Sequence, residues 1–235
     1  MDIQRSFTFQ FEDRQWASKL GLGGLITMIP ILNFAWTGYM VEIVRNVKGG
    51  VSPTLPEWDD IGKKFSEGLM LGLAGLVYAL PLLLLFGIPF TVLILSGLLS
   101  GSQDLQGLSG MLAGTGGLLF PLVACVAVIY GLLMALVQPA IFLIYSRTGS
   151  FASCFDFRRI SEIITRNSGP YFTVWGLSLV AGIGVGMVVS IVGGLVGWIP
   201  CIGWIVTLVL SLGSTVYITS IFSHLVGQLG AQIVE

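Results

Sequence analysis

Residues 167–223 read NSGPYFTVWGLSLVAGIGVGMVVSIVGGLVGWIPCIGWIVTLVLSLGSTVYITSIFS and contain no Asp, Glu, Lys, Arg or His. Two further stretches, 68–103 and 105–146, are equally free of charge. Each of the three is long enough for a helix of about 20 apolar residues, the length that crosses a bilayer. A soluble domain needs charged side chains on its outward faces, and these stretches have none. The sequence therefore predicts an all-α integral membrane protein.

The overall composition supports this class. Hydrophobic residues make up 54% of the 235 residues and charged residues only 10%, whereas about a quarter of a soluble domain is charged. The mean hydropathy is +0.91. The 32 glycines are typical of membrane helices that pack closely. A net charge of -1 and the lack of a Lys/Arg tract argue against nucleic acid as a partner.

The eleven Lys and Arg residues predict the orientation in the membrane. They fall into three clusters, whereas the linker at 100–116 and the turn at 197–203 contain none. Because Lys and Arg are enriched in cytoplasmic loops, residues 1–13, 46–64 and 147–167 are expected in the cytoplasm and both bare segments outside. This arrangement predicts membrane hairpins at about 68–145 and 170–226, with both termini cytoplasmic.

Residues 14–47 allow two interpretations. They are either one span, which gives five spans in total, or a short hairpin, which gives about six membrane-embedded helices in three hairpins. An internal repeat favours the hairpin, because GGLITMIPILNF at 23–34 matches GGLVGWIPCIGW at 193–204 in its Gly-Gly-Leu and Ile-Pro pairs. The second copy lies at the expected outer turn, where its proline can begin the returning helix. Helices of about 15 residues would reach only about 22–24 Å of the roughly 30 Å core.

Each of the two later hairpins follows a predicted amphipathic helix, at about 55–66 and 154–166. The first has a capping box at Thr54–Glu57, and both carry apolar residues at helical spacing with charges on the other faces. Such helices lie along the membrane surface, where they orient the next span or dock a partner or anionic headgroups. The candidate docking residues are Leu55, Pro56, Glu57, Trp58, Asp59, Asp60, Lys63, Lys64, Arg158 and Arg159.

Five short motifs carry a resemblance to a known family. They are Asp13-x-x-Trp16, Gly23-Gly24-Leu25, Gly38-Tyr39, Leu55-Pro56-Glu57-Trp58-Asp59-Asp60 and Gly68-Leu69, with a looser match at Ile199-Pro200 and Leu225-x-Gly227-Gln228. In this order they resemble the family known as domain of unknown function 4013, whose members are prokaryotic multi-pass membrane proteins. The resemblance implies a single membrane module over residues 1–235 in the prokaryotic cell membrane. It implies no activity, because the family has none assigned.

Two stripes of side chains recur four residues apart within the predicted spans. Gly182, Gly186, Ser190 and Gly194 form a small-residue stripe. This pattern is typical of close helix packing, and a seam between copies of the chain is the alternative. Thr207, Ser211, Thr215, Thr219 and Ser223 form a hydroxyl stripe. Its hydroxyls either bond to carbonyls of the preceding turn or, with Gln138, line a polar path. Gln138 precedes Pro139, whose freed carbonyl it can satisfy; otherwise it is a candidate substrate contact.

The residues that are missing argue against catalysis and ion coupling. No carboxylate, His or basic residue is expected at mid-membrane, where ion-coupled transporters keep one. No catalytic triad or nucleotide-binding motif is present in a usable context. Cys125, Cys154 and Cys201 are far apart and are interpreted as apolar fillers. We expect no enzyme activity, no cofactor and no metal; a metal site at Glu57, Asp59 and Asp60 is less favoured than a solvated helix face.

These observations predict a non-enzymatic structural or accessory subunit that contacts lipids or other membrane proteins, or a second copy of itself. The alternative function is a carrier or conduit for a neutral or lipid-like solute. It would use the hydroxyl stripe and Gln138.

Overall fold

The computed structural model describes residues 1–233, and all the elements in this range are helices, which confirms the all-α class. In chain order they are α1 (Ile3–Thr8), η1 (Phe9–Glu12), α2 (Trp16–Met28), α3 (Asn33–Lys48), α4 (Ile61–Leu99), η2 (Gln103–Leu105), α5 (Gln106–Thr148), η3 (Phe151–Phe155), α6 (Phe157–Arg166), α7 (Ser168–Val196) and α8 (Ile202–Gln232), where η marks a 3₁₀ helix.

Four helices, α4, α5, α7 and α8, are long and apolar enough to cross a membrane. They correspond to the two hairpins predicted at 68–145 and 170–226. Between 6% and 17% of the most apolar window of each helix is buried within the protein. Because so little of their apolar surface is covered by the chain itself, these helices need an apolar environment outside it.

Residues 14–47 form two helices, so the alternative of one continuous span through this segment is wrong. The chain reverses between α2 and α3, and a Cβ placed on Gly23 of α2 would lie 2.5 Å from the ring of Trp36 in α3. The two helices have 13 and 16 residues. They are therefore shorter than the roughly 20 residues that a perpendicular span requires.

The same kind of turn joins α2 to α3 and α7 to α8, which gives the sequence repeat a structural counterpart. In both turns a proline is followed by a residue with positive φ, 75° at Ile31 and 62° at Cys201. Pro30 and Pro200 lie within the turns and do not begin the returning helices, because α3 and α8 begin further along the chain.

The first predicted amphipathic helix is wrong over residues 55–60, which are not helical. The cap of α4 is Asp60 and not Thr54: the Asp60 carboxylate accepts a hydrogen bond of 3.0 Å from the backbone N–H of Lys63. Pro56 explains the difference, because a proline disfavours the helical conformation of the residue before it. The capping-box pattern did not take this into account.

The second predicted amphipathic helix corresponds to α6, which begins at Phe157 because the preceding residues form η3. The carboxylate of Asp156 caps its first turn. Ile160 and Ile163 are buried, whereas Arg158 is exposed on the opposite side. Amphipathic character and a place along the membrane surface stay a prediction for this helix.

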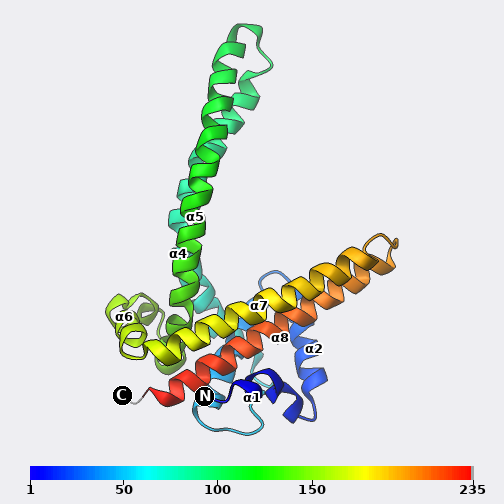
Figure 1. Ribbon diagram of the computed structural model, residues 1–235, viewed down its shortest axis with the longest axis vertical. Helices are drawn as coiled ribbons and strands as arrows, with labels where there is room; N and C mark the ends of the chain where they lie inside the picture. The colour runs from blue at the N-terminus through cyan, green and yellow to red at the C-terminus, as the bar shows by residue number, and fades with distance from the viewer. Residues whose placement is uncertain (234–235) are drawn as a thin grey trace. The chain divides into compact units, whose positions relative to one another are not determined.

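The chain forms two compact units, one of residues 1–73 and residues from 137 onward, the other of residues 74–136. In the first unit, α8 is central: it contacts α1, α2, α3 and α7, and Figure 1 shows α7 running beside it. A Cβ on Gly227 of α8 would lie 2.5 Å from the side chain of Val47 in α3. Glycine at this position lets the two helices approach closely.

The second unit is a helical hairpin made by the parts of α4 and α5 within residues 74–136 (Figure 1). The Tyr130 hydroxyl donates a hydrogen bond of 2.6 Å to the carbonyl of Tyr78. Near the connecting turn, the hydroxyls of Ser96 and Ser109 each donate to the other residue's carbonyl, at 2.9 and 3.0 Å. Reciprocal bonds of this kind fix the pairing of two otherwise apolar helices.

Candidate functional site

The LPEWDD motif, residues 55–60, folds against the α2–α3 hairpin. The Trp58 ring stacks on Tyr39, with ring centroids 4.6 Å apart, and Tyr39 stacks on Trp36 at 5.0 Å. The Tyr39 hydroxyl donates a hydrogen bond of 3.0 Å to the carbonyl of Pro56. The predicted docking role therefore does not extend to Trp58, because its ring packs against the chain itself.

A buried ion-pair cluster holds the same motif from the other side. The Lys19 ammonium, whose side chain is 5% exposed, lies 2.7 Å from an Asp13 oxygen and 2.6 Å from a Glu57 oxygen. The Trp58 indole N–H donates to the carbonyl of Lys19 at 2.9 Å. Burial acts to raise the pKa of the Asp13 carboxyl, but hydrogen bonds from Lys19 and the Gln15 backbone N–H outweigh it and lower this pKa. These contacts stabilise the fold.

Lys64 is also internal, contrary to its predicted place on a docking surface. Its side chain is 3% exposed, and its ammonium lies 2.8 Å from Glu42 and 3.5 Å from Asp59. Leu55 and Pro56 are buried as well. The exposed members of the predicted docking set are Glu57, Asp59, Asp60, Lys63 and Arg158. Among residues 1–233, no group of three His, Cys, Asp or Glu side chains is placed to hold a metal ion.

Arginines gather beside α6. Arg158 pairs with Glu162 at 3.2 Å. Arg159 and Arg166 line a cavity of about 280 Å³ together with Arg147 of α5 and Glu162. Three cations and one carboxylate give this cavity a positive potential, which favours an anionic ligand or surface. The sequence predicted Arg158 and Arg159 here but not Arg147.

The predicted small-residue stripe of α7 does not pack against another helix within the described chain. A Cβ on Gly182, Gly186 or Gly194 would meet nothing within 4 Å, and Ser190 is exposed. The expectation of close packing inside the fold is therefore wrong for these positions, and a seam between copies stays a prediction. A spacing of four residues shows which residues share a face but not which face meets a neighbour.

The close approach occurs at two glycines of the family motifs instead. A Cβ on Gly38 would lie 1.8 Å from the carbonyl oxygen of Lys64, and a Cβ on Gly68 would lie 1.7 Å from that of Phe34. Helices α3 and α4 thus cross backbone to backbone, which only glycine allows at this distance.

The hydroxyl stripe of α8 is bonded mainly within its own helix. Thr207, Thr215, Thr219 and Ser223 each donate to the carbonyl four residues earlier, at 2.7–2.9 Å. Of these four, only Thr219 also accepts a hydrogen bond from another helix: the Trp36 indole N–H of α3 donates to its hydroxyl at 3.0 Å. Ser211 is half-buried and supplies its carbonyl to Thr215. The hydroxyls of the stripe are therefore satisfied mainly within their own helix, and no water-filled path is needed to hydrogen-bond them.

Gln138 does not satisfy a carbonyl freed by Pro139. Its side chain is exposed and makes none of the hydrogen bonds found among residues 1–233. The backbone just beyond the proline is bonded by Tyr171 of α7, whose hydroxyl accepts from the N–H of Ala140 at 3.3 Å. A substrate contact at Gln138 stays an untested alternative.

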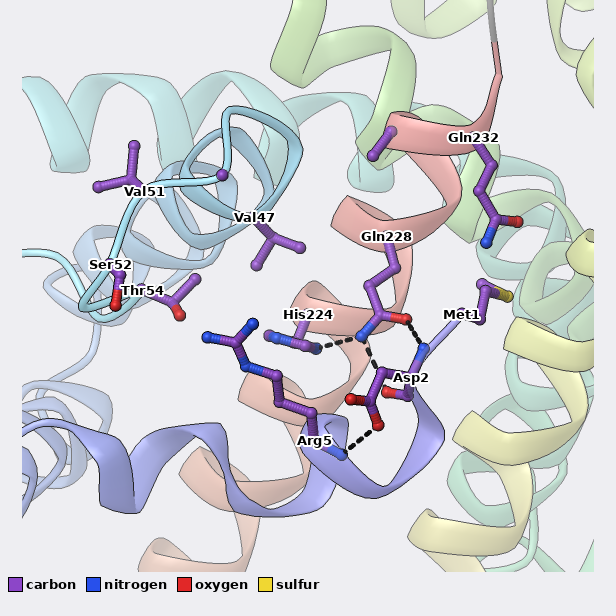
Figure 2. Close-up of a pocket in the computed structure, with 12 residues that line it drawn as sticks. Met1, Asp2, Arg5, Val47, Val51, Ser52, Thr54, His224, Gln228 and Gln232 are labelled. Carbon is purple, nitrogen blue, oxygen red and sulfur yellow. Dashed lines mark hydrogen bonds between the residues drawn. The ribbon is translucent and has the colours of Figure 1, made fainter.

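A polar cavity of about 430 Å³, which the sequence did not predict, lies between α1, the loop after α3 and the last turns of α8 (Figure 2). His224 is 3% exposed there and stacks on Phe9, with ring centroids 4.2 Å apart. Its Nδ1 lies 3.0 Å from the Ser6 hydroxyl and 3.2 Å from the Gln228 amide nitrogen. The spacing of His224 and Gln228 by four residues was the only local signal, because Ser6 comes from the other end of the chain.

The comparisons with known proteins agree with the sequence motifs. A model of a protein family of unknown function, DUF4013, matches residues 22–194. No curated protein and no solved structure matches the chain. The match covers well over half of the chain and includes the LPEWDD motif and the glycines of the α3–α4 crossing. The chain therefore belongs to the DUF4013 family.

Proposed function

We propose that this protein is a non-enzymatic, multi-pass subunit of a prokaryotic cell membrane that contacts lipids or the helices of other membrane proteins. The observation that carries the proposal is the uncovered apolar surface of α4, α5, α7 and α8. In a bilayer this surface meets lipid tails or other helices. The short helices α2 and α3 complete a third, inset hairpin, which makes six membrane-embedded helices.

The distribution of polar groups favours a subunit over a conduit. A conduit must offer polar groups to a solute that has lost its hydration. The threonine hydroxyls of α8 donate to carbonyls of their own helix, and the buried lysine Lys19 and the partly buried Arg45 pair with carboxylates of the first unit. Few polar groups are therefore left to line a path.

The face of α6 that carries Arg158 is proposed to lie against the cytoplasmic leaflet. Its buried isoleucines pack against the protein, while its arginines and those of the neighbouring cavity attract anionic headgroups. The proposed orientation rests on the Lys and Arg clusters, which the positive-inside rule assigns to the cytoplasmic side.

A photo-crosslinking experiment in native membranes tests this function. A photoreactive residue at Val180 of α7, which is 68% exposed, should form adducts with lipid or with a second protein. The same residue at Val174, which is fully buried, should react only within the chain. Flux of a neutral solute such as glycerol through liposomes containing the protein, beyond that of empty liposomes, would favour the conduit instead.

A further inference from the structure

The hydrogen bonds around the His224 cavity connect the α1 region to α8. Asp2 and Arg5 of the α1 region, Thr54 of the loop, and His224 and Gln228 of α8 all face this cavity (Figure 2). All of these residues belong to the first unit. The cavity is separate from the apolar surfaces on which the proposed function rests.

The orientation of the Gln228 amide is fixed by the backbone of Asp2. The Asp2 N–H can only donate, and it lies 2.8 Å from Gln228 Oε1. The Asp2 carbonyl can only accept, and it lies 2.9 Å from Gln228 Nε2. Exchanging the oxygen and nitrogen of the amide would break both bonds.

This orientation determines which nitrogen of His224 carries the proton. Gln228 Nε2 has hydrogens but no lone pair to offer, and it lies 3.2 Å from His224 Nδ1. A proton on Nδ1 would face these hydrogens, which favours the tautomer in which Nδ1 accepts and the proton lies on Nε2. The Ser6 hydroxyl lies 3.0 Å from Nδ1 and 3.1 Å from the Asp2 carbonyl, and it can donate its one hydrogen to either.

The protonated Nε2 of His224 points into the cavity, on the ring edge away from Gln228 (Figure 2). No partner for this nitrogen occurs among residues 1–233, although the residue is 3% exposed. The nitrogen itself is not among the fully buried side-chain atoms that lack a partner, so it is open to the cavity, where an acceptor can reach it. The missing partner is therefore expected to be an acceptor from outside the chain.

Two further donors face the same space. The Arg5 guanidinium bonds Glu12 through Nε and Nη2, at 3.0 and 2.9 Å, which leaves Nη1 for another acceptor. The Thr54 hydroxyl also has no partner within the described part of the chain. The one carboxylate that lines the cavity, on Asp2, accepts a hydrogen bond of 2.9 Å from the backbone N–H of Arg5 and keeps its negative charge.

We propose that this cavity binds a small oxyanion, a phosphate or carboxylate group, held by His224 Nε2–H, Arg5 Nη1 and the Thr54 hydroxyl. A cluster of donors suits an acceptor with several oxygens. The cavity volume of about 430 Å³ accommodates a small metabolite or a single headgroup.

The single histidine of the chain makes the proposal directly measurable. The full-length protein, labelled with ¹⁵N-histidine and purified in a maltoside detergent, has one imidazole signal set. We expect Nδ1 to have the chemical shift of an unprotonated nitrogen and Nε2 that of a protonated one. Inorganic phosphate should shift Nε2 in a saturable manner, and sodium chloride of equal ionic strength should not.

Variants identify the donors. Arg5→Gln removes a charged donor and should weaken phosphate binding about tenfold or more, and Thr54→Val should weaken it about fivefold. Arg14→Gln removes the same charge from an exposed position that has no hydrogen bond or ion pair in the described chain, and should change binding less than twofold. An unprotonated Nδ1 signal in each variant shows that the network around His224 is intact.

A second arm separates the two sources of the oxyanion. Nanodiscs of phosphatidylglycerol replace the inorganic phosphate; a response to these alone assigns the site to a lipid headgroup, and a response to phosphate assigns it to a soluble ligand. The proposal is overturned if neither probe shifts Nε2, or if Arg5→Gln and Thr54→Val bind as wild type does. These outcomes leave the subunit proposal untouched, because that rests on crosslinks from α7.

Discussion

Ile31 and Cys201 occupy the same position in two turns of one kind, and both have a positive φ, of 75° and 62°. In each turn the residue two before them, Ile29 or Ile199, donates its N–H to a carbonyl of the preceding helix. A positive φ costs a residue other than glycine about 1–2 kcal/mol. The turn is thus a strained element that the chain uses twice.

Relieving this strain should stabilise the protein. We expect Ile31→Gly to raise the free energy of unfolding by up to about 1 kcal/mol, because the strain relieved exceeds the extra entropy lost by glycine. Ile31 is 67% exposed, so little packing is lost. Leu32→Gly is the matched control. Leu32 is 41% exposed and has ordinary helical φ and ψ, so the glycine relieves no strain and the variant should be less stable than the wild type. Thermal unfolding in detergent measures both, and a loss in Ile31→Gly equal to that in Leu32→Gly would contradict the strain argument.

Gly68 should be intolerant of a single added methyl group. A Cβ there would overlap the Phe34 carbonyl oxygen at 1.7 Å, so Gly68→Ala must push α3 away from α4. We expect a loss of roughly 1–3 kcal/mol or more. Gly186→Ala, in open surroundings within α7, should be neutral or stabilising by up to about 1 kcal/mol. Equal melting temperatures for the two variants would rule out the backbone crossing.

The Lys19–Asp13 pair predicts a loss of stability in acid. The pKa of the Asp13 carboxyl is lower in the folded state than its ordinary value, which is near 4. The contribution of this carboxylate to the free energy of unfolding is therefore complete above about pH 4. It is lost as the pH falls through the lowered pKa. Asp13→Asn should therefore flatten the stability profile below about pH 4. Lys19→Met should cost about 3–5 kcal/mol at neutral pH, since it leaves a buried carboxylate unpaired. Asp104→Asn, in the exposed linker, is the control for the pH dependence of stability. If this variant flattens the stability profile as much as Asp13→Asn does, Asp13 is not the cause of the acid loss.

The long apolar helices could be predicted because charge is absent from them over whole spans. The repeat at 23–34 and 193–204 likewise predicted the first hairpin, since Ile-Pro placed in register marks the same turn. In these cases the decisive information is local in the sequence. Each feature depends on the composition or spacing of one segment.

The contacts of the LPEWDD motif and the packing glycines depended on tertiary structure and were missed. Trp58 and Lys64 looked like a membrane-facing surface because their partners, Tyr39 and Glu42, come from another helix. Gly186 and Gly68 are equally plausible packing residues by local pattern. Only the approach of a second backbone, found at Gly68, distinguishes them.

The cysteines of the chain test the proposed orientation. Cys201 is exposed in the α7–α8 turn, and we expect an impermeant maleimide to label it from outside intact cells when Cys125 is replaced by Ala. Cys154 should stay silent, since it is buried and burial raises its thiol pKa to about 11. Val51→Cys, added to the same background with Cys201→Ala, should react only after permeabilisation. Labelling of Val51→Cys in intact cells would reverse the proposed topology.

The hydroxyls of α8 separate packing from conduction. Thr215 is exposed and its hydroxyl donates only to its own helix, so Thr215→Val should cost less than about 1 kcal/mol.

Thr219 also accepts a hydrogen bond from the indole N–H of Trp36, a residue that is almost fully buried. Thr219→Val leaves that donor without a partner and should cost about 1–3 kcal/mol. The double variant Thr219→Val with Trp36→Phe should lose less stability than the sum of the two single variants, because donor and acceptor are removed together. Thermal unfolding measures the stabilities of Thr215→Val, of both single variants and of the double variant, and liposome flux of glycerol is measured alongside. A stripe that serves packing gives this order of stabilities with no flux in any variant. A folded Thr215→Val protein that abolishes a flux present in the wild type would instead assign the stripe to a conduit.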